Sequence, residues 1–298
     1  MELCDRLWLG TVQIGKRYGL ARRRQSRKES ANLLDYAWEM GVRRFDTARN
    51  YGDSEERIGD WIAQTGNRPI VTSKVPRMDE IPDADIAAFV ANCVEESRRD
   101  LHLDRLDVYL CHRHEDFERT SVRDALHEEL ARGRITRFGV SCYGPEEALK
   151  AMALDPATAF IQLPASLIDR RVQHSDLPAS AAARNVTVAV RSLFLQGILL
   201  VAADRLPDHL ARLAPIVSAV GEIAAGVGIS PAVLAIGYVL TRLPKADLVL
   251  GFHTNAQLRE IERFQGNFTE YEPAYSELDQ RIGNVDPFLV DPRGWPTP

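Results

Sequence analysis

Short apolar runs alternate with longer stretches of helical spacing along the whole chain. Eight runs of four to seven residues, rich in aliphatic and β-branched side chains, are predicted as strands. They are Leu7–Val12, Val42–Phe45, Pro69–Val75, Leu106–Cys111, Ile135–Ser141, Ala159–Leu163, Val186–Ser192 and Asp247–Gly251. Most are apolar over nearly their whole length, which is typical of strands buried on both faces.

Apolar residues with a period of three to four fill the stretches between these strands. Between Glu29 and Met40, for example, Leu33, Leu34 and Ala37 share one helical face. The predicted helices are Glu29–Met40, Ser54–Gln64, Asp85–Leu101, Ser121–Arg132, Pro145–Met152, Ser175–Arg184, Asp208–Gly226, Pro231–Thr241 and Asn255–Phe264. No linker-like or low-complexity stretch divides this alternation.

Regular strand–helix alternation predicts a parallel sheet. In a chain of 298 residues, eight such units favour a single closed (β/α)8 TIM barrel over an open doubly wound sheet. We expect one domain over residues 1–298, in which 267–298 form a C-terminal tail without a clear period. The aromatic residues of this tail are candidates to pack on the side of the barrel.

Composition narrows the function classes. A net charge of -5 argues against nucleic-acid binding as the main activity. The four cysteines, Cys4, Cys93, Cys111 and Cys142, lack CxxC spacing, which suits a reducing cytosol and indicates neither a metal site nor a disulfide framework. The first residues lack the apolar region of a signal peptide, and no apolar run approaches membrane-spanning length. We therefore expect a cytoplasmic protein whose partner is a small molecule.

Four residues with ionisable side chains fall at or just after predicted strand ends. Asp46 ends the second strand, Lys74 lies at the end of the third, His112 follows the fourth, and Tyr51 lies in the loop after the second. In a parallel barrel these ends share one rim, which is where barrel enzymes carry their chemistry. Each residue alone has an ordinary structural explanation, such as a solvated loop or a snorkelling lysine. Their coincidence on neighbouring strands favours an active site.

The residue types point to proton transfer by Tyr51. An isolated phenol has a pKa of about 10, and a nearby ammonium group lowers that value by stabilising the phenolate. Lys74 is the candidate for that charge, Asp46 for keeping it protonated, and His112 for orienting the reacting oxygen. None of the four can donate a hydride, so a nicotinamide cofactor is implied.

Three spaced motifs carry a resemblance to a known family. They read F-D-T-A-R-N-Y-G-D-S-E-E-R-I-G from Phe45, T-S-K-V from Thr72 and L-D-V-Y-L-C-H from Leu106. In order and spacing the chain closely resembles the aldo-keto reductase superfamily, from Leu9 to the helix after Gly251. The resemblance implies a barrel fold, the catalytic tetrad Asp46, Tyr51, Lys74 and His112, a carbonyl substrate, and NADPH as the usual cofactor, with NADH possible. It also implies a second possibility for the C-terminal tail, that it helps to wall the substrate pocket.

The same resemblance implies a set of cofactor-binding residues. G-V-S-C-Y from Gly139 resembles G-V-S-N-F, whose Ser and Asn hold the nicotinamide carboxamide, although Cys142 stands where Asn is usual. Arg191 replaces the aromatic residue that would stack on the ring, and a guanidinium can also stack. The implied residues are Ser141, Cys142, Gln162, Arg191, Ser192, Leu195, Gly197, Gly251, His253, Thr254, Gln257 and Glu260.

The adenosine end of this set has little positive charge. Many members of the family place Lys or Arg there to hold the 2′-phosphate. This chain has Gly251, His253 and Gln257 at those positions, and a histidine is only partly charged at neutral pH. We expect use of NADPH with modest discrimination against NADH.

Basic residues suggest a polar substrate. A loop rich in Gly and Arg follows the first strand, and Arg113 and His114 follow the catalytic histidine candidate. They are candidates to bind a sugar-like or anionic substrate, although a solvated basic loop is an equally simple explanation. The substrate candidates are Arg22, Arg23, Arg24, Arg113 and His114.

Two further motifs are misleading. Gly10–Arg17 almost spells a phosphate-binding loop, but Arg17 stands where Ser or Thr is required. The sequence H-R-H at 112–114 lacks a carboxylate or cysteine at ligand spacing, so no metal site is predicted.

Three functions stay open on the sequence. The leading one is an NADPH-dependent carbonyl reductase. An epimerase or lyase that uses the nicotinamide transiently is the second, because Cys142 and Arg191 depart from the usual pattern. The third is a cofactor-binding regulatory subunit, against which the intact tetrad argues.

Overall fold

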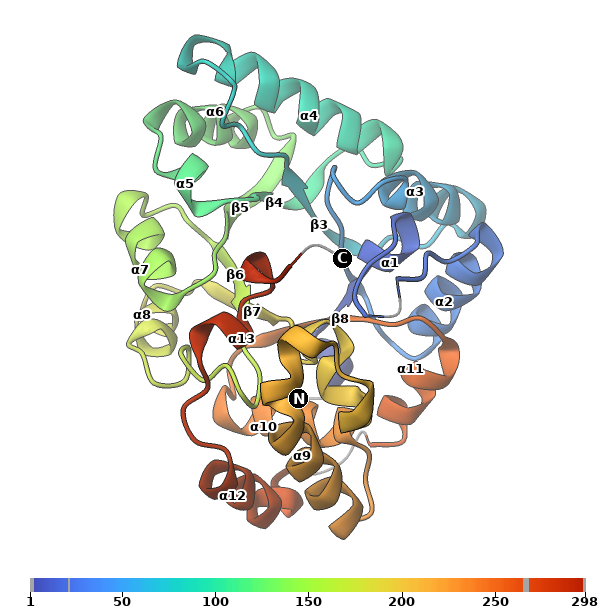
Figure 1. Cartoon of the computed structure of the whole chain (residues 1–298). Coiled ribbons are helices and arrows are strands. Elements are labelled where there is room, and N and C mark those ends of the chain that lie inside the picture. Colours follow the sequence, from blue (N-terminus) through green and yellow to red (C-terminus); the bar gives the residue numbers. More distant parts are fainter. Residues whose placement is uncertain (1–2, 21, 265–267, 297–298) are drawn as a thin grey trace.

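Eight parallel strands form a closed barrel surrounded by helices (Figure 1). This computed structural model describes residues 3–20, 22–264 and 268–296. The strands are β1 (Leu7–Gly10), β2 (Arg44–Asp46), β3 (Ile70–Val75), β4 (Leu106–Cys111), β5 (Ile135–Ser141), β6 (Phe160–Pro164), β7 (Thr187–Arg191) and β8 (Asp247–Gly251). Neighbours in the chain pair in parallel, and β1 closes on β8 with Gly10 opposite Gly251. The predicted (β/α)8 barrel is confirmed.

Helices cover the outside of the barrel because each buries one apolar face on it. In α2, Ser26 and Glu29 form a reciprocal capping box, and Leu33, Leu34 and Ala37 are buried. The helices are α1 (Val12–Gly15), α2 (Arg27–Glu39), α3 (Ser54–Thr65), α4 (Ile86–Asp100), α5 (His114–Phe117), α6 (Thr120–Ala131), α7 (Pro145–Leu154), α8 (Leu177–Ala183), α9 (Ala214–Gly226), α10 (Pro231–Arg242), α11 (Asn255–Glu262), α12 (Glu272–Arg281) and α13 (Pro287–Val290).

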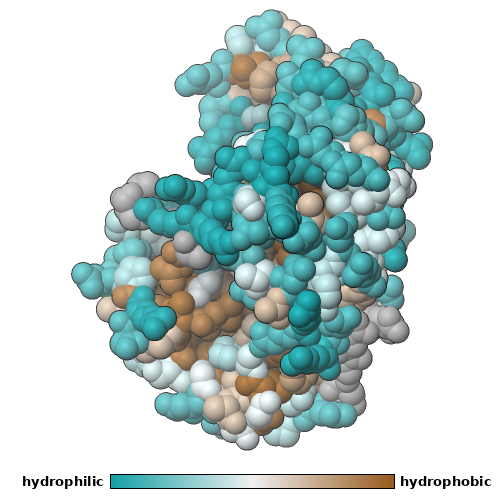
Figure 2. All heavy atoms as spheres, turned by 90° about the vertical axis from the view of Figure 1, so that its right-hand side faces the viewer, coloured by the Kyte–Doolittle hydropathy of each residue, from teal (hydrophilic) through white to brown (hydrophobic). Residues whose placement is uncertain are grey.

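The surface is polar over most of the face shown in Figure 2, and its hydrophobic residues gather in a hollow toward the lower left. Within the described part of the chain, no single helix has the length and apolarity needed to cross a membrane. One pair, Asp208–Gly226 with Pro231–Arg242, meets that test together by length and composition only, and it is bent by 92°.

Two sequence-based expectations need correction. The first strand was expected to reach Val12, but β1 ends at Gly10, and the short helix α1 runs from Val12 into the expected loop. The tail was expected to lack a period, yet it contains α12 and α13. The helix α12 has only 10 residues and buries Ala274, Tyr275 and Leu278, which is too few positions to form a readable pattern.

The barrel lumen is apolar at its floor and polar at its mouth. At the floor, Trp8 and Phe160 lie edge to face with ring centroids 5.3 Å apart. They belong to a separate buried cluster that also contains Leu110. Alternate residues of a strand face the same side. Lys74 is in register with Leu110, and Gln162 comes two residues after Phe160, so both face the lumen nearer the mouth.

Candidate active site

The buried ion pair at the barrel mouth joins β2 and β3. Lys74 is fully buried, and its Nζ donates to both carboxylate oxygens of Asp46 at 2.9 Å and to the carbonyl of Thr47 at 2.8 Å. The side-chain amide of Gln162 donates to the same carboxylate at 2.7 Å. Burial lowers the pKa of Lys74, and Asp46 opposes that effect. The carboxylate thus favours the charged form of an amine that is fully buried.

Tyr51 is held by close backbone packing against α1. Its amide donates to the carbonyl of Ala48 at 2.9 Å in the turn after β2. A Cβ at Gly15 would lie 1.6 Å from the carbonyl oxygen of Tyr51, so only glycine fits there. Gly52 has a φ of 65°, and a Cβ there would lie 2.4 Å from the carbonyl oxygen of Gly15. The two glycines therefore let the Tyr51 loop lie directly on α1.

The four residues of the sequence-based tetrad meet around the phenol ring. The amine of Lys74 lies 5.0 Å from the ring centroid of Tyr51, and the imidazole of His112 lies edge-on with its centroid 6.1 Å away. A further amine, that of Lys16, lies 5.4 Å from the same centroid and donates to the carbonyl of Asn50. Lys16 was not among the predicted site residues, and its place in the first loop was the only signal.

Burial sets the protonation states of this group. It raises the pKa of Tyr51 well above the ordinary value, and Asp46 adds to the rise. This corrects the expectation that Lys74 would lower that pKa, because the ammonium charge is compensated by Asp46 at 2.9 Å. Burial, aided by the nearby cations Lys74 and Arg191, lowers the pKa of His112 to about 3. At neutral pH the phenol is therefore protonated and the imidazole is neutral.

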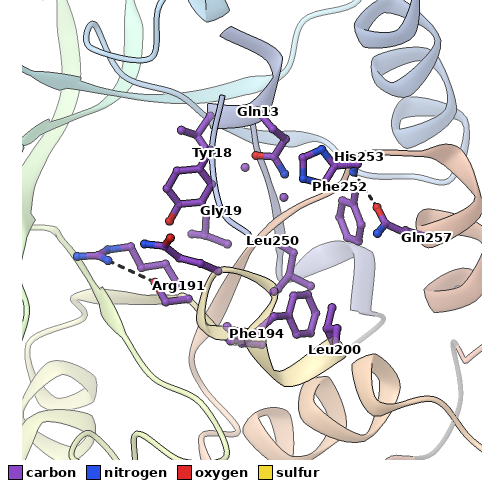
Figure 3. A pocket seen from close by; sticks show the side chains of 18 of the residues that line it. Gln13, Tyr18, Gly19, Arg191, Phe194, Leu200, Leu250, Phe252, His253 and Gln257 are labelled. Carbon is purple, nitrogen blue, oxygen red and sulfur yellow. Dashed lines mark hydrogen bonds between the residues drawn. The ribbon is translucent and has the colours of Figure 1, made fainter. Parts of the chain in front are cut away.

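A cavity of about 540 Å³ runs from Asp46 and Tyr51 of this tetrad to the turn between β8 and α11. Figure 3 shows the part of its lining from Tyr18 and Arg191 to His253 and Gln257. Tyr51 and Asp46 line one end, and His253 and Gln257 line the other. Eight of the expected cofactor residues line it: Gln162, Arg191, Ser192, Gly197, Gly251, His253, Gln257 and Glu260. The cavity therefore joins the two groups of residues that the sequence assigned to the two ends of one cofactor.

The other four expected cofactor residues do not line the cavity. They are Ser141, Cys142, Leu195 and Thr254. Cys142 is fully buried in the apolar core, and burial raises the pKa of its thiol. Thr254 uses its hydroxyl to cap α11, accepting the amide of Gln257. A cofactor-binding role for these four remains a prediction.

A loop from the first strand crosses the cavity. The amide of Leu20 donates to the carbonyl of Gln196 at 3.0 Å, and Gly19 approaches the same carbonyl so closely that a Cβ would lie 2.9 Å from it. Tyr18 lines the cavity on the side of Arg191 (Figure 3). Burial raises its pKa to about 12. No sequence motif singled out Tyr18.

Two guanidinium groups lie over the ring of Tyr143. Arg191 lies 4.6 Å from its centroid and donates to the carbonyl of Cys142 at 3.1 Å. Arg293, from the C-terminal tail, lies 3.6 Å from the same centroid. The tail therefore reaches the mouth of the barrel, in line with the second of the two expectations for it, although Arg293 itself was not singled out.

Unsatisfied buried oxygens show what the cavity can bind. The side-chain oxygens Oε1 of Gln13 and Gln162 have no hydrogen-bond partner among the described residues, although both side chains are nearly fully buried. A buried acceptor without a donor is costly, so a ligand with amide donors would be stabilised there. An elongated polar ligand such as a nicotinamide dinucleotide fits this lining.

The predicted substrate residues are mostly paired with carboxylates. Arg23 pairs with Glu29 and Arg24 with Asp53. Arg113 pairs with Asp79 and Glu115, and Nδ1 of His114 lies 3.2 Å from both Glu115 and Glu147. Arg22 is exposed at a φ of 44°. None of the five lines the cavity, so their contact with a substrate remains a prediction.

Known proteins are similar to this chain in sequence and in fold. The model of the "Aldo/keto reductase family" matches residues 6–275. A methylglyoxal reductase of Escherichia coli is 26% identical over 258 residues, which cover 84% of this chain and 85% of that protein. A glycerol dehydrogenase structure from Gluconobacter oxydans superposes with a TM-score of 0.74 at 21% identity, covering 95% of this chain and 94% of the other.

A structure of an aldo/keto reductase from Klebsiella pneumoniae in complex with NADP and acetate superposes with a TM-score of 0.70. It is 23% identical and covers 94% of this chain and 95% of its own. At such identities the two structures support the fold alone, whereas the family model spans nearly the whole barrel. The chain belongs to the aldo/keto reductase family, whose members are oxidoreductases that act on carbonyl substrates with NADP(H).

Proposed function

We propose that this chain is an NADPH-dependent carbonyl reductase in which Tyr51 is the general acid. One observation carries the proposal: the buried Lys74–Asp46 pair lies beside the ring of Tyr51, at one end of a cavity of about 540 Å³ that reaches the turn between β8 and α11. A phenol next to a compensated ammonium group, facing a cavity, is suited to give and regain a proton.

The residues divide the reaction between them. NADPH, when bound, supplies the hydride that adds to the carbonyl carbon. Tyr51 gives its proton to the carbonyl oxygen, which becomes strongly basic as its carbon is reduced. An alkoxide is a stronger base than a phenolate, so the raised pKa of Tyr51 does not prevent the transfer. Lys74 stabilises the phenolate that remains, and neutral His112 donates a hydrogen bond that orients the oxygen.

The cavity residues would hold the cofactor along its length. The free oxygen of Gln162 suits the nicotinamide carboxamide, for which the family resemblance also implies Ser141 and Cys142, although neither lines the cavity. The planar guanidinium of Arg191 takes the place of an aromatic residue against the ring. At the other end, His253, Gln257 and Glu260 line the cavity and Thr254 caps the adjoining helix, as expected for the adenosine side.

A polar or anionic aldehyde or ketone is the proposed substrate class. Lys16 and Arg191 lie near Tyr51 and His112, and no carboxylate pairs with either of them in the described part of the chain. The cations Lys74, Arg191, Lys16 and Arg77 all lower the pKa of His112, which indicates a positive potential at the mouth. The relatives named for methylglyoxal and glycerol also act on small polar molecules.

Consumption of NADPH tests the proposal. The protein is incubated with NADPH and pairs of neutral and carboxylate-bearing aldehydes, and NADPH absorbance and product are both followed. The variant Tyr51→Phe is expected to lower kcat by about 10²- to 10⁴-fold and leave NADPH binding intact, because only the transferable proton is lost.

Other outcomes contradict the proposal in distinct ways. Conversion of substrate without net NADPH consumption would indicate an epimerase or lyase. NADPH binding without turnover of any carbonyl compound would favour a regulatory subunit. A Tyr51→Phe variant as active as the wild type would exclude Tyr51 as the general acid.

A further inference from the structure

The adenosine end of the cavity has no cation of its own. In the segment from Gly251 to Glu262 the only arginine or lysine is Arg259, whose guanidinium lies 5.2 Å from the ring centroid of Tyr36. Glu260 lines the cavity and adds a carboxylate. Burial and the charge of Arg23 lower the pKa of His253, so its imidazole is neutral at physiological pH. A 2′-phosphate would meet a net negative wall here unless another element supplied positive charge.

The loop between β1 and α2 is anchored to this end. Gln25 is buried, and its side-chain amide donates to the carbonyls of Phe252 and His253 at 3.0 and 3.2 Å. Arg57 donates to the carbonyl of Gln25 at 2.8 Å, and the backbone of Arg23 pairs with that of Tyr18 in an antiparallel bridge. These contacts hold Arg23 between the cavity-lining Tyr18 and the anchored Gln25.

The side chain of Arg23 is positioned and still accessible. Its guanidinium pairs with Glu29, which is itself fixed by the amide and hydroxyl of Ser26 at 2.9 Å. The Arg23 side chain is 46% exposed. Because a guanidinium has five N–H donors, one carboxylate leaves donors free for a second anion.

Two polar atoms beside this loop lack partners. Nδ1 of His253 and Oε1 of Gln13 have no hydrogen-bond partner within the described ranges, and both residues line the cavity (Figure 3). Gln13 is only 4% exposed and lies against Gly251, just before the turn that opens α11. The capping box of α11 already satisfies the backbone amides of His253, Thr254 and Gln257. The turn therefore offers a ligand Nδ1 of His253, and the oxygen of Gln13 offers an acceptor for a donor group of the same ligand.

We propose that Arg23, with His253 and the first turn of α11, forms the binding site for the 2′-phosphate of NADPH. The inference rests on the proposed function, since it assumes that the cavity holds NADPH. It moves Arg23 from substrate capture, where the sequence suggested it, to cofactor selection. The positive charge that relatives carry after the last strand comes here from the loop after the first.

Arg24 provides a matched control. It has the same charge and lies next to Arg23, but its guanidinium pairs with Asp53 before α3. The carboxylate of Asp53 also forms an ion pair with Arg57, whose Nε lies 3.0 Å from Oδ2 of Asp53. A general effect of loop charge would appear in both Arg23→Ala and Arg24→Ala, whereas a phosphate contact would appear only in the first.

Binding measurements test the inference without turnover. Fluorescence titration gives Kd for NADPH and NADH, and calorimetry compares 2′,5′-ADP with 5′-AMP, since each pair differs only in the 2′-phosphate. We expect Arg23→Ala to raise Kd for NADPH and for 2′,5′-ADP by about tenfold or more, as for loss of a charged hydrogen bond. NADH and 5′-AMP should be unchanged, Arg24→Ala should resemble the wild type, and Arg23→Lys should restore part of the preference.

The results separate the two levels of the proposal. If the wild-type protein binds neither NADPH nor NADH, the proposed function fails and the inference falls with it. If the wild type prefers NADPH and Arg23→Ala keeps that preference, the inference alone is overturned. An equal loss for NADPH and NADH in Arg23→Ala would also overturn it, because it would show a role in loop structure.

Discussion

The two ends of the cavity are built in different ways. At the catalytic end, Asp46, Lys74 and Gln162 project from strands into the lumen and are almost fully buried, with each charge compensated by a hydrogen bond. At the proposed adenosine end, His253 and the proposed phosphate ligand Arg23 come from loops and are partly exposed. The difference teaches that the buried charges supporting the proposed proton donor Tyr51 are placed on rigid strands, although Tyr51 itself lies in the loop after β2. Selection among cofactors is left to surface charges, which can change without disturbing the barrel.

Removal of the buried cation should give the largest effect in this comparison. In Lys74→Met, Asp46 stays buried without its partner, so we expect kcat to fall by about 10²- to 10⁴-fold. The free energy of unfolding should fall by about 3–5 kcal/mol, as when one partner of a buried pair is lost. Steady-state kinetics and urea denaturation measure the two effects.

The double variant Lys74→Met/Asp46→Asn separates stability from chemistry. It removes the uncompensated charge and should recover much of the lost stability while kcat stays low. Recovery of both quantities together would contradict the assignment of Lys74 to catalysis.

The contact between the tail and the barrel mouth should give a smaller effect. Arg293→Ala removes a cation from the ring of Tyr143 and leaves the strands intact. We expect KM for an anionic carbonyl substrate to rise about two- to fivefold, the range of one cation–π contact, while kcat changes little. Arg281→Ala is the control, because this tail arginine pairs with Glu222 and Glu277 on the outside. Equal changes in KM in both variants would contradict a specific role of Arg293.

The smallest effect on kcat is expected from a change of pH. The kcat for reduction should stay nearly constant from about pH 5 to about pH 9. Tyr51 has a pKa above the ordinary phenol value of about 10, so the proton donor is not lost as pH rises through this range. His112, with a pKa of about 3, stays neutral as pH falls to 5. A kinetic pKa near 6.5 that disappears in His112→Ala would contradict the buried, neutral imidazole.

Sequence patterns predicted the parts of the molecule that depend on periodicity. The ends of the strands fixed where Asp46, Lys74 and His112 would lie, because parallel strands of a barrel share one rim. The same pattern could not give the direction of the pKa shift of Tyr51, which depends on burial and on how Asp46 compensates Lys74. It also could not show which residue the Arg23 side chain faces, because a loop without a period is positioned by tertiary contacts such as those of Gln25.

The contact between Gly15 and Tyr51 has a consequence for the tolerance of this enzyme to change. Even one added methyl group at position 15 would overlap a main-chain oxygen of the catalytic loop and force the phenol out of place. An alanine there would thus resemble an active-site lesion in its effect on rate, although position 15 does not line the cavity. The position of Tyr51, the proposed proton donor, therefore depends on the absence of a side chain thirty-six positions earlier in the chain.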